Sequence, residues 1–286
     1  MKMAVIGCGL IGGSMALSWK RAGIVDEVIA FGHNPATLQK ALDKGVADTV
    51  TTSMEEAVKD ADIVVSAVPV EAMESVFTEM APFLKSDAVV TDVGSTRQTV
   101  IAAARKGLGD KFHQYAPAHP IAGGEMPGVD YASADLFDEK VVISTPDEGM
   151  DPKVVTFIEE AWRKAGARVQ AMSPLQHDLT FASVSHLPHV LAYALVDMIA
   201  REENAQEKLK MAGAGFRDFT RIASSSPVMW RDICLSNREA LSHELKRYRA
   251  SLDTLQKYID ESDGKALESV FENAVRNRRG LVFPGK

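Results

Sequence analysis

The sequence predicts an α/β Rossmann-type doubly wound sheet, followed by an all-helical C-terminal domain that dimerises. Short apolar runs alternate with helical patterns in the first half, a glycine-rich turn follows the first run, and no convincing strand occurs after Ser173. Strands that alternate with helices favour a parallel sheet with right-handed crossovers. We therefore divide the chain into a sheet domain at residues 1–172 and a helical domain at residues 173–286.

The first domain contains apolar runs rich in β-branched residues, which predict buried strands. These strands are expected at residues 3–6, 27–31, 61–68, 88–93, 141–144 and 167–170. Helices are expected at residues 13–22, 36–44 and 152–165. The region between residues 94 and 140 is left without a predicted strand.

The second domain shows long amphipathic patterns at residues 174–201, 207–214, 227–258 and 264–278. The first of these helices carries an apolar stripe that needs a large partner surface, and the stripe consists of Phe181, Leu187, Leu191, Leu195 and Ile199. A second copy of the chain is the simplest partner, so we expect a homodimer through this domain. Packing of the helices on one another is the alternative.

Composition excludes several classes of protein. The 286 residues are 46% apolar and 25% charged, with a formal net charge of −7 and no basic stripe, which argues against a nucleic-acid partner. Cys8 and Cys234 lie far apart without the spacing of metal ligands, so we expect neither a disulfide framework nor a zinc site. A reducing cytoplasm fits this pattern.

The N-terminal apolar segment is not expected to be a signal peptide, because glycines at positions 7, 9, 12 and 13 interrupt it. We also expect no membrane contact, because we expect no stretch to reach the roughly 18 to 20 uncharged apolar residues that are needed to span a bilayer.

The glycine-rich turn is Gly7-Cys8-Gly9-Leu10-Ile11-Gly12, directly after the first predicted strand. The first glycine permits the tight turn, the second lets the backbone approach a pyrophosphate, and the third lets the helix pack closely on the strand. Free N–H groups at the helix start, around Leu10 and Ile11, then bind the phosphate. The turn predicts a nicotinamide dinucleotide site, with a purely structural strand-to-helix turn as the alternative.

The end of the second strand bears on the choice between NAD and NADP. An acidic residue there binds the ribose 2′-hydroxyl of NAD, but this chain has Gly32, His33 and Asn34 instead. Because His33 and Asn34 can donate hydrogen bonds to a 2′-phosphate, NADP is slightly favoured, with NAD as the alternative. Further cofactor contacts are expected at Ala67, Val68 and Pro69, which otherwise form a strand cap.

Five further segments occur in order along the chain: Asp92-Val-Gly-Ser-Thr96, Ala118-His-Pro-Ile-Ala-Gly-Gly-Glu125, Ser185-His-Leu-Pro-His189, Gly215-Phe-Arg-Asp-Phe-Thr-Arg-Ile-Ala223 and Pro227-Val-Met-Trp-Arg-Asp232. Together with the glycine turn they closely resemble the prephenate/arogenate dehydrogenases of tyrosine biosynthesis. The resemblance implies NAD(P)-dependent oxidative decarboxylation of prephenate, an anionic cyclohexadiene, to 4-hydroxyphenylpyruvate. Hydride leaves the ring carbon that bears the hydroxyl, and loss of CO2 makes the ring aromatic. The alternative is an arogenate dehydrogenase, which gives tyrosine directly.

The same resemblance assigns the catalytic pair. It makes His119 the residue that takes the proton of the substrate hydroxyl, a role that suits an imidazole at cytoplasmic pH. It places Ser95 between the hydroxyl, His119 and the nicotinamide. Considered alone, His119 is a turn histidine in a loop before Pro120, and Ser95 is a good helix N-cap.

The resemblance also assigns substrate-binding residues. Arg221 matches an arginine that binds the side-chain carboxylate, for which a planar guanidinium is suited. His189 matches a pocket histidine, and Trp230 matches a tryptophan that reaches towards the partner subunit's site. Arg217 is interpreted as part of an ion pair with Asp218 or a neighbour.

His186 is taken as structural. A metal held by His186 and His189 is disfavoured, because no carboxylate or cysteine stands at ligand spacing.

Two positions depart from the family pattern. Gly124 replaces a threonine next to the retained Glu125, and both are expected near the substrate. Ala214 interrupts a run of glycines. Neither position affects the assigned roles of His119, Ser95 or Arg221.

Two other functions stay open on the sequence alone. A β-hydroxyacid dehydrogenase shares this domain order but needs a helical lysine, and none occurs between Lys164 and Lys208. A non-catalytic dinucleotide sensor would not need a proton acceptor and a carboxylate clamp together.

Overall fold

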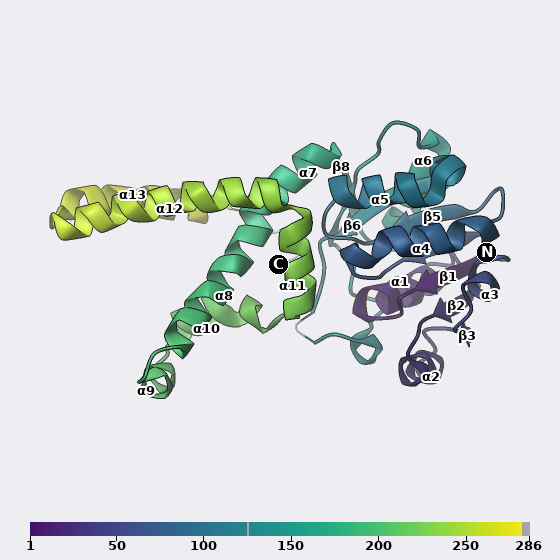
Figure 1. The fold of residues 1–286 in the computed structure, drawn as a ribbon, viewed down its shortest axis with the longest axis horizontal. Helices are drawn as coiled ribbons and strands as arrows, with labels where there is room; N and C mark the ends of the chain where they lie inside the picture. Colours follow the sequence, from purple (N-terminus) through teal and green to yellow (C-terminus); the bar gives the residue numbers. More distant parts are fainter. Residues whose placement is uncertain (125, 282–286) are drawn as a thin grey trace.

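The structure is a computed structural model that describes residues 1–124 and 126–281. Within these residues one sheet has the strand order β3-β2-β1-β4-β5-β6-β7-β8, with helices on both faces (Figure 1). The strands are β1 Lys2–Ile6, β2 Glu27–Phe31, β3 Thr49–Thr51, β4 Ile63–Ser66, β5 Val89–Asp92, β6 Tyr115–Pro120, β7 Val141–Ser144 and β8 Arg168–Ala171. The reversal of strand order between β1 and β4 creates the crevice in which such sheets bind ligands.

Three features of the sheet differ from the prediction, and the first is the short strand β3, for which no strand was predicted. All neighbouring strands run parallel except β6 and β7, which pair antiparallel with His119 opposite Ile143. The strand β6 itself was not predicted, because Pro117 and Pro120 break the pattern of a regular strand. Its pairing with β5 and β7 overrides this weak local propensity. His119 therefore lies on a strand rather than in a loop.

Alternation along β1 shows how the sheet is covered on both faces. Met3 and Val5 belong to one hydrophobic cluster, while Ala4 and Ile6 belong to the other, as expected for a period of two. The helices of this domain are α1 Leu10–Arg21, α2 Pro35–Asp43, α3 Met54–Val58, α4 Met73–Met80, α5 Gln98–Leu108 and α6 Pro152–Lys164. Helix α1 begins three residues earlier than predicted, because the glycine turn leads directly into it.

The second domain is helical throughout its described residues, as predicted. Its elements are α7 Pro174–Phe181, the π-helical turn η5 Ala182–His186, α8 Leu187–Ala200, α9 Ala205–Lys210, α10 Ala214–Thr220, the 3-10 turn η6 Arg221–Ser224, α11 Pro227–Ser236, α12 Arg238–Asp260 and α13 Gly264–Arg279. The single helix predicted at 227–258 is divided into α11 and α12 at Asn237. The side-chain amide of Asn237 donates a hydrogen bond to the backbone carbonyl of Asp178.

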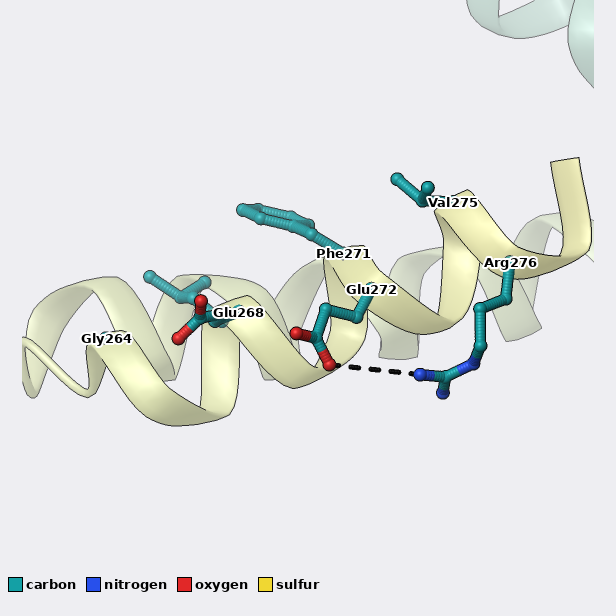
Figure 2. A pocket seen from close by; sticks show the side chains of 7 residues that line it. Gly264, Glu268, Phe271, Glu272, Val275 and Arg276 are labelled. Atoms are coloured by element: carbon teal, nitrogen blue, oxygen red, sulfur yellow. Dashed lines mark ion pairs between the residues drawn. The ribbon is translucent and has the colours of Figure 1, made fainter. Parts of the chain in front are cut away.

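Helices α12 and α13 form a hairpin that projects far from the sheet domain (Figure 1). Figure 2 shows Phe271 and Val275 on the exposed face of α13, beside the ion pair of Glu272 with Arg276. These residues, with Leu267, line a shallow groove. No residue of α13 is buried in this chain. The hairpin therefore presents an uncovered apolar surface.

The expectation that no stretch has the length and composition to span a bilayer was wrong. The helical run Pro174–Ala200 has both, because residues 179–196 contain no Asp, Glu, Lys or Arg. Only 22% of its most apolar window is buried within this chain.

Candidate functional site

A cavity of about 450 Å³ lies where the carboxyl ends of the parallel strands meet the helical domain. Its sheet-domain wall includes Gly9, Leu10, Ile11, Ala67, Val68, Pro69, Ser95, His119 and Gly124. Its helical wall includes Ser185, His186, Ser225, Met229, Trp230 and Ile233. The predicted catalytic pair and much of the predicted cofactor site therefore share one space.

The glycine turn has the geometry that its sequence predicts. Gly7 has a φ of +96°, and a Cβ there would lie 2.7 Å from the carbonyl oxygen of Ala67. A Cβ on Gly12 would lie 2.4 Å from the carbonyl oxygen of Gly7, so the helix needs glycine for its close approach. Around Gly9, by contrast, nothing lies within 4 Å of a Cβ position. The turn is closed on the protein side and open at Gly9, where a ligand can approach.

The end of β2 has a structural role that the sequence did not indicate. The side-chain oxygen of Asn34 accepts hydrogen bonds from the backbone N–H groups of Ala36 and Thr37, at 2.9 and 3.4 Å, and so caps α2. The His33 ring packs edge-on against Phe31. Gly32, His33 and Asn34 do not line the cavity itself.

The loop that carries Ser95 is held by a buried polar cluster. The guanidinium of Arg97 contacts the Asp92 carboxylate at 2.6 Å, and the Tyr115 hydroxyl donates to the same carboxylate at 2.5 Å. Burial, reinforced by the negative charge of Asp92, raises the pKa of Tyr115 well above its ordinary value, so the phenol stays protonated as a donor. The backbone N–H of Gly94 donates to Asp92 at 2.7 Å. These contacts fix the loop over the cavity.

The alternative role of Ser95 as a helix N-cap is not found in the structure. Helix α5 has Arg97 at its N-cap position without a side-chain cap from its own segment. The Asp178 carboxylate of the helical domain accepts instead from the backbone N–H groups of Arg97 and Gln98, at 2.8 and 2.9 Å. A residue from the other domain therefore caps α5, and Ser95 lines the cavity.

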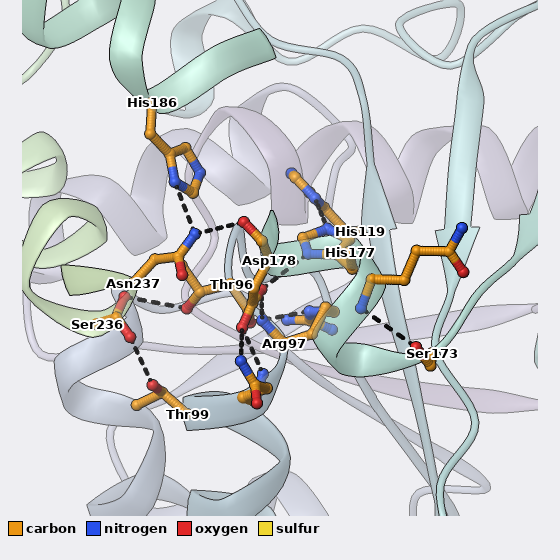
Figure 3. A network of polar contacts seen from close by, with 12 residues as sticks. Thr96, Arg97, Thr99, His119, Ser173, His177, Asp178, His186, Ser236 and Asn237 are labelled. Carbon is orange, nitrogen blue, oxygen red and sulfur yellow. Dashed lines mark hydrogen bonds and ion pairs between the residues drawn. The ribbon is translucent and has the colours of Figure 1, made fainter. Parts of the chain in front are cut away.

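His119 forms a chain of contacts that leads away from the cavity (Figure 3). Its Nδ1 lies 2.8 Å from Nε2 of His177, and Nδ1 of His177 lies 2.9 Å from Oδ1 of Asp178. The rings of His177 and Phe181 stack at 4.4 Å between centroids. Burial lowers the pKa of His119 well below its usual value, and the neighbouring His177, Arg97 and His186 act in the same direction. The imidazole is therefore neutral at physiological pH.

His177 and Asp178 were missed by the sequence analysis. The available signal was an adjacent His-Asp pair in the first turns of a helix that begins at Ser173-Pro174, where Ser173 caps the helix. That spacing indicates nothing about His119, which lies 58 residues earlier in the chain.

The remaining predicted substrate residues form a second group at the helical wall. The His189 ring stacks on the indole of Trp230 with centroids 3.6 Å apart, and its Nδ1 lies 2.9 Å from the carbonyl oxygen of Ser185. Burial, together with the charge of Arg221, lowers the pKa of His189. Trp230 lines the cavity, whereas His189 and Arg221 do not, and Arg221 is exposed. Trp230 therefore lines the same cavity as Ser95 and His119 of its own chain.

His186 has both a structural contact and a place in the cavity wall. Asn237 donates to its Nδ1 at 3.1 Å, and burial lowers the pKa of His186 to about 4. Arg217 pairs with Asp218 at 3.7 Å on the exposed surface, as the sequence suggested.

Two departures from the family pattern differ in their surroundings. A Cβ at Gly124 would contact the Leu10 side chain at 3.3 Å, so glycine leaves room beside the turn. Ala214 is exposed at the start of α10. The predicted role of Glu125 falls outside the described residues.

Among residues 1–124 and 126–281 no group of three or more His, Cys, Asp or Glu side chains has the arrangement of a metal site.

Comparison with protein families gives two matches that together cover nearly the whole chain. The family model described as "Prephenate dehydrogenase, nucleotide-binding domain" matches residues 15–171, and "Prephenate dehydrogenase, dimerization domain" matches residues 173–273. A cyclohexadienyl dehydrogenase of Zymomonas mobilis is 36% identical over 98% of this chain and 95% of its own length. A prephenate dehydrogenase of Bacillus subtilis is 35% identical over 98% of this chain and 76% of its own length.

Solved structures give the same result. The prephenate dehydrogenase of Aquifex aeolicus, in complex with hydroxyphenyl propionate and NAD+, has a TM-score of 0.90 and 34% identity over 98% of each chain. A Synechocystis arogenate dehydrogenase has a TM-score of 0.81 and 27% identity, over 99% of this chain and 100% of its own.

Proposed function

The chain belongs to the prephenate dehydrogenase family, and from that premise we propose how its own residues carry out the reaction. The protein is an NAD-dependent oxidoreductase with prephenate/cyclohexadienyl dehydrogenase activity in tyrosine biosynthesis. This membership replaces the two other functions considered above, the β-hydroxyacid dehydrogenase and the dinucleotide sensor.

The observation that carries the catalytic assignment is the shared cavity of Ser95, His119 and the glycine turn. In the proposed reaction the substrate O–H bond breaks and its proton goes to the His119 imidazole. The hydride leaves the ring carbon that bears this oxygen. The bond to the ring carboxylate breaks, and its electron pair completes the aromatic ring as CO2 departs. His119 then returns the proton to the oxygen, which gives the phenol. Bound NAD+ supplies the hydride acceptor. The lowered pKa of His119 keeps the imidazole ready to accept a proton.

We propose that the Ser95 hydroxyl holds the substrate oxygen near His119, since both residues line the same cavity. Its loop is fixed by Asp92 and Arg97, so the hydroxyl needs little ordering when substrate binds.

The charge of the cavity wall supports a decarboxylation. Among the described residues that line it, none is a lysine or an arginine. The ring carboxylate that must leave is therefore not held by an ion pair in this wall, which would stabilise the charged ground state. The charge of Arg221 acts on His189, whose ring stacks on the cavity residue Trp230. We assign Arg221, His189 and Trp230 to the side-chain carboxylate.

Trp230 has an additional property that fits a binding role. Its indole N–H is buried and has no hydrogen-bond partner among the described residues. A buried donor without a partner costs free energy, which a substrate or partner-subunit acceptor would recover.

For the cofactor we propose NAD rather than NADP. The slight preference for NADP rested on His33 and Asn34, but the Asn34 side-chain oxygen caps α2, and the solved Aquifex relative is described with NAD+. Gly7, Gly9 and Gly12 would hold the pyrophosphate through the start of α1, and Ala67, Val68 and Pro69 would border the adenosine half. The ratio of kcat/KM for NAD and for NADP tests this choice.

Prephenate is the proposed substrate, with arogenate as the alternative that some relatives use. The two differ by a keto or an amino group on the side chain. Glu125 and Gly124 remain our candidates for sensing it. Initial rates with each substrate at saturating NAD decide between them, and equal rates would make the enzyme a cyclohexadienyl dehydrogenase.

We also propose that residues 1–172 form the cofactor domain and that residues 173–286 form the substrate and dimerisation domain. The matched dimerisation model and the poorly buried Pro174–Ala200 run support a homodimer. A cytoplasmic location is proposed because Cys8 and Cys234 are both free thiols.

A further inference from the structure

A continuous polar chain connects the cavity with the junction between the two domains. It starts at His119, passes through the fully buried ring of His177 and ends on Asp178 (Figure 3). The same carboxylate accepts from the start of α5, where the Ser236 and Thr99 contacts also join the domains. The proposed base is therefore in contact with the domain junction through one intervening side chain.

The direction of each hydrogen bond follows from the far end of this chain. Although burial raises the pKa of Asp178, hydrogen bonds from His177 and from the backbone of Gln98 and Arg97 outweigh it and lower the pKa. Asp178 is thus ionised and can only accept. The proton between Asp178 and His177 must belong to Nδ1 of His177.

The state of His177 then determines that of His119. Burial lowers the pKa of His177, even though the hydrogen bond to Asp178 acts in the opposite direction, so the ring is neutral. A neutral ring with a proton on Nδ1 presents a lone pair at Nε2. That Nε2 lies 2.8 Å from Nδ1 of His119, which must therefore carry the donated proton. The lone pair of neutral His119 is left on its Nε2.

We propose that His177 and Asp178 are positioning residues for the reaction, which hold His119 in the tautomer whose Nε2 is the proton acceptor. The inference rests on the proposed function of His119 as the base. It follows the logic of a catalytic triad, in which a buried carboxylate fixes the tautomer and orientation of the active imidazole. Here a second imidazole lies between the carboxylate and the base.

The relay also serves the protonated state of the base. When the substrate proton arrives at Nε2, His119 becomes an imidazolium whose Nδ1–H still has an acceptor in His177. No electrons are gained or lost in this step, and the imidazolium returns the proton to the product oxygen, so that the product leaves as the phenol. The charged and titratable groups that face His119 are Arg97, His177 and His186. All three lower its pKa and so disfavour the imidazolium. The hydrogen bond to His177, supported by Asp178, offsets that effect.

The test compares His177→Phe with His177→Gln. Phenylalanine keeps the stacking on Phe181 but removes the acceptor, whereas glutamine retains an oxygen that can accept from His119. We expect kcat to fall about 100-fold in His177→Phe and to recover to within about 10-fold of wild type in His177→Gln, with the KM for prephenate changed much less. The matched control is His113→Phe at an exposed imidazole, for which kcat should not change.

A structural role alone would not alter the protonation of His119, so the second measurement reports on it directly. Nitrogen NMR of the protein labelled at its seven histidines distinguishes protonated from unprotonated ring nitrogens, and the His119→Asn variant assigns the signals. The wild type should show a protonated Nδ1 and an unprotonated Nε2 at His119. In His177→Phe both ring nitrogens should show a mixture of tautomers.

The outcomes separate this inference from the proposed function. If His119→Asn turns over at near the wild-type rate, the base assignment itself fails. If His119→Asn is inactive while His177→Phe keeps the wild-type kcat, only the relay is overturned. A protonated Nε2 on wild-type His119 also overturns it. Unchanged NAD binding by His177→Phe, measured by calorimetry, shows that the variant is folded.

Discussion

The two halves of this chain differ in how far their apolar side chains are exposed. In β1 the residues Met3, Ala4, Val5 and Ile6 are each 0% exposed, whereas along the helical half Val184 is 66% exposed and Phe271 is 55% exposed. The sheet domain thus completes its own core, while the helical domain leaves its apolar surface for a partner. The cavity lies between them. The proposed base therefore belongs to the half whose apolar residues are covered within one chain, and the proposed substrate-binding residues belong to the half whose apolar residues are exposed.

The largest effect is expected for the base on the sheet half. His119→Asn should lower kcat by about 10³-fold, because asparagine cannot accept the hydroxyl proton. Stopped-flow and steady-state rates at saturating prephenate and NAD measure the loss. NAD affinity, determined in parallel, should stay unchanged because the glycine turn is intact. Near wild-type turnover would remove the base from the mechanism.

The next largest effect is expected at the uncovered helical surface. Phe271→Asp puts a charge on the apolar face of α13 and should weaken the dimer on the order of 100-fold, as for a buried aromatic anchor. Sedimentation equilibrium measures the dissociation constant. Lys265→Glu, a charge change on the same helix, is the control and should leave it unchanged. A dimer as tight as wild type in Phe271→Asp would show that this face is not part of the interface.

Glycines distinguish the two halves on a smaller scale. Gly12→Ala should weaken NAD binding about 10-fold and destabilise the fold by about 1 to 3 kcal/mol, because its Cβ would overlap the Gly7 carbonyl at 2.4 Å. Gly213→Ala, in the helical half, has nothing within 4 Å of its Cβ and should change neither. Calorimetric titration with NAD and urea unfolding measure both quantities. Equal effects of the two substitutions would show that the space around each glycine Cβ position does not decide the outcome.

The smallest effect concerns pH. Because the pKa of His119 lies well below 6.5, the base stays unprotonated as pH falls through 6.5. We therefore expect kcat/KM for prephenate to vary less than about 2-fold between pH 6 and pH 8 and to decline only at more acidic pH, as His119 gains its proton. A pH–rate profile with saturating NAD measures this. An acid limb centred near 6.5 would mean that burial does not lower this pKa.

The elements that were predicted correctly have strong local signals. Strand β7 was predicted at its observed bounds, and α6 to within one residue, because each combines an uninterrupted pattern with clear ends. Strand β6 was missed because its prolines weaken the pattern and only its neighbours β5 and β7 stabilise it. Local sequence gives no measure of such pairing.

The candidate site likewise contains residues that local sequence marks and residues that depend on contacts with distant segments. The glycine turn and His119 were found because spacing or family resemblance marks them. The contacts of His177 and Asp178 were missed, including the cap that Asp178 provides for α5, because they join segments 58 to 81 residues apart. The break at Asn237 has the same origin, since its amide is used 59 residues away.

The place of His119 on β6 has a consequence for how this catalyst can change over time. The strand pairs with β5 through its first half and with β7 through its second. The backbone that carries His119 is therefore held by the sheet and does not have to become ordered at each turnover. Trp230 and Arg221, in contrast, belong to α11 and η6, which are separate helical segments. Under the roles proposed above, substitutions there alter which substrate side chain the enzyme accepts, while the proposed proton acceptor stays in place. Selectivity and catalytic power can therefore evolve separately in this fold.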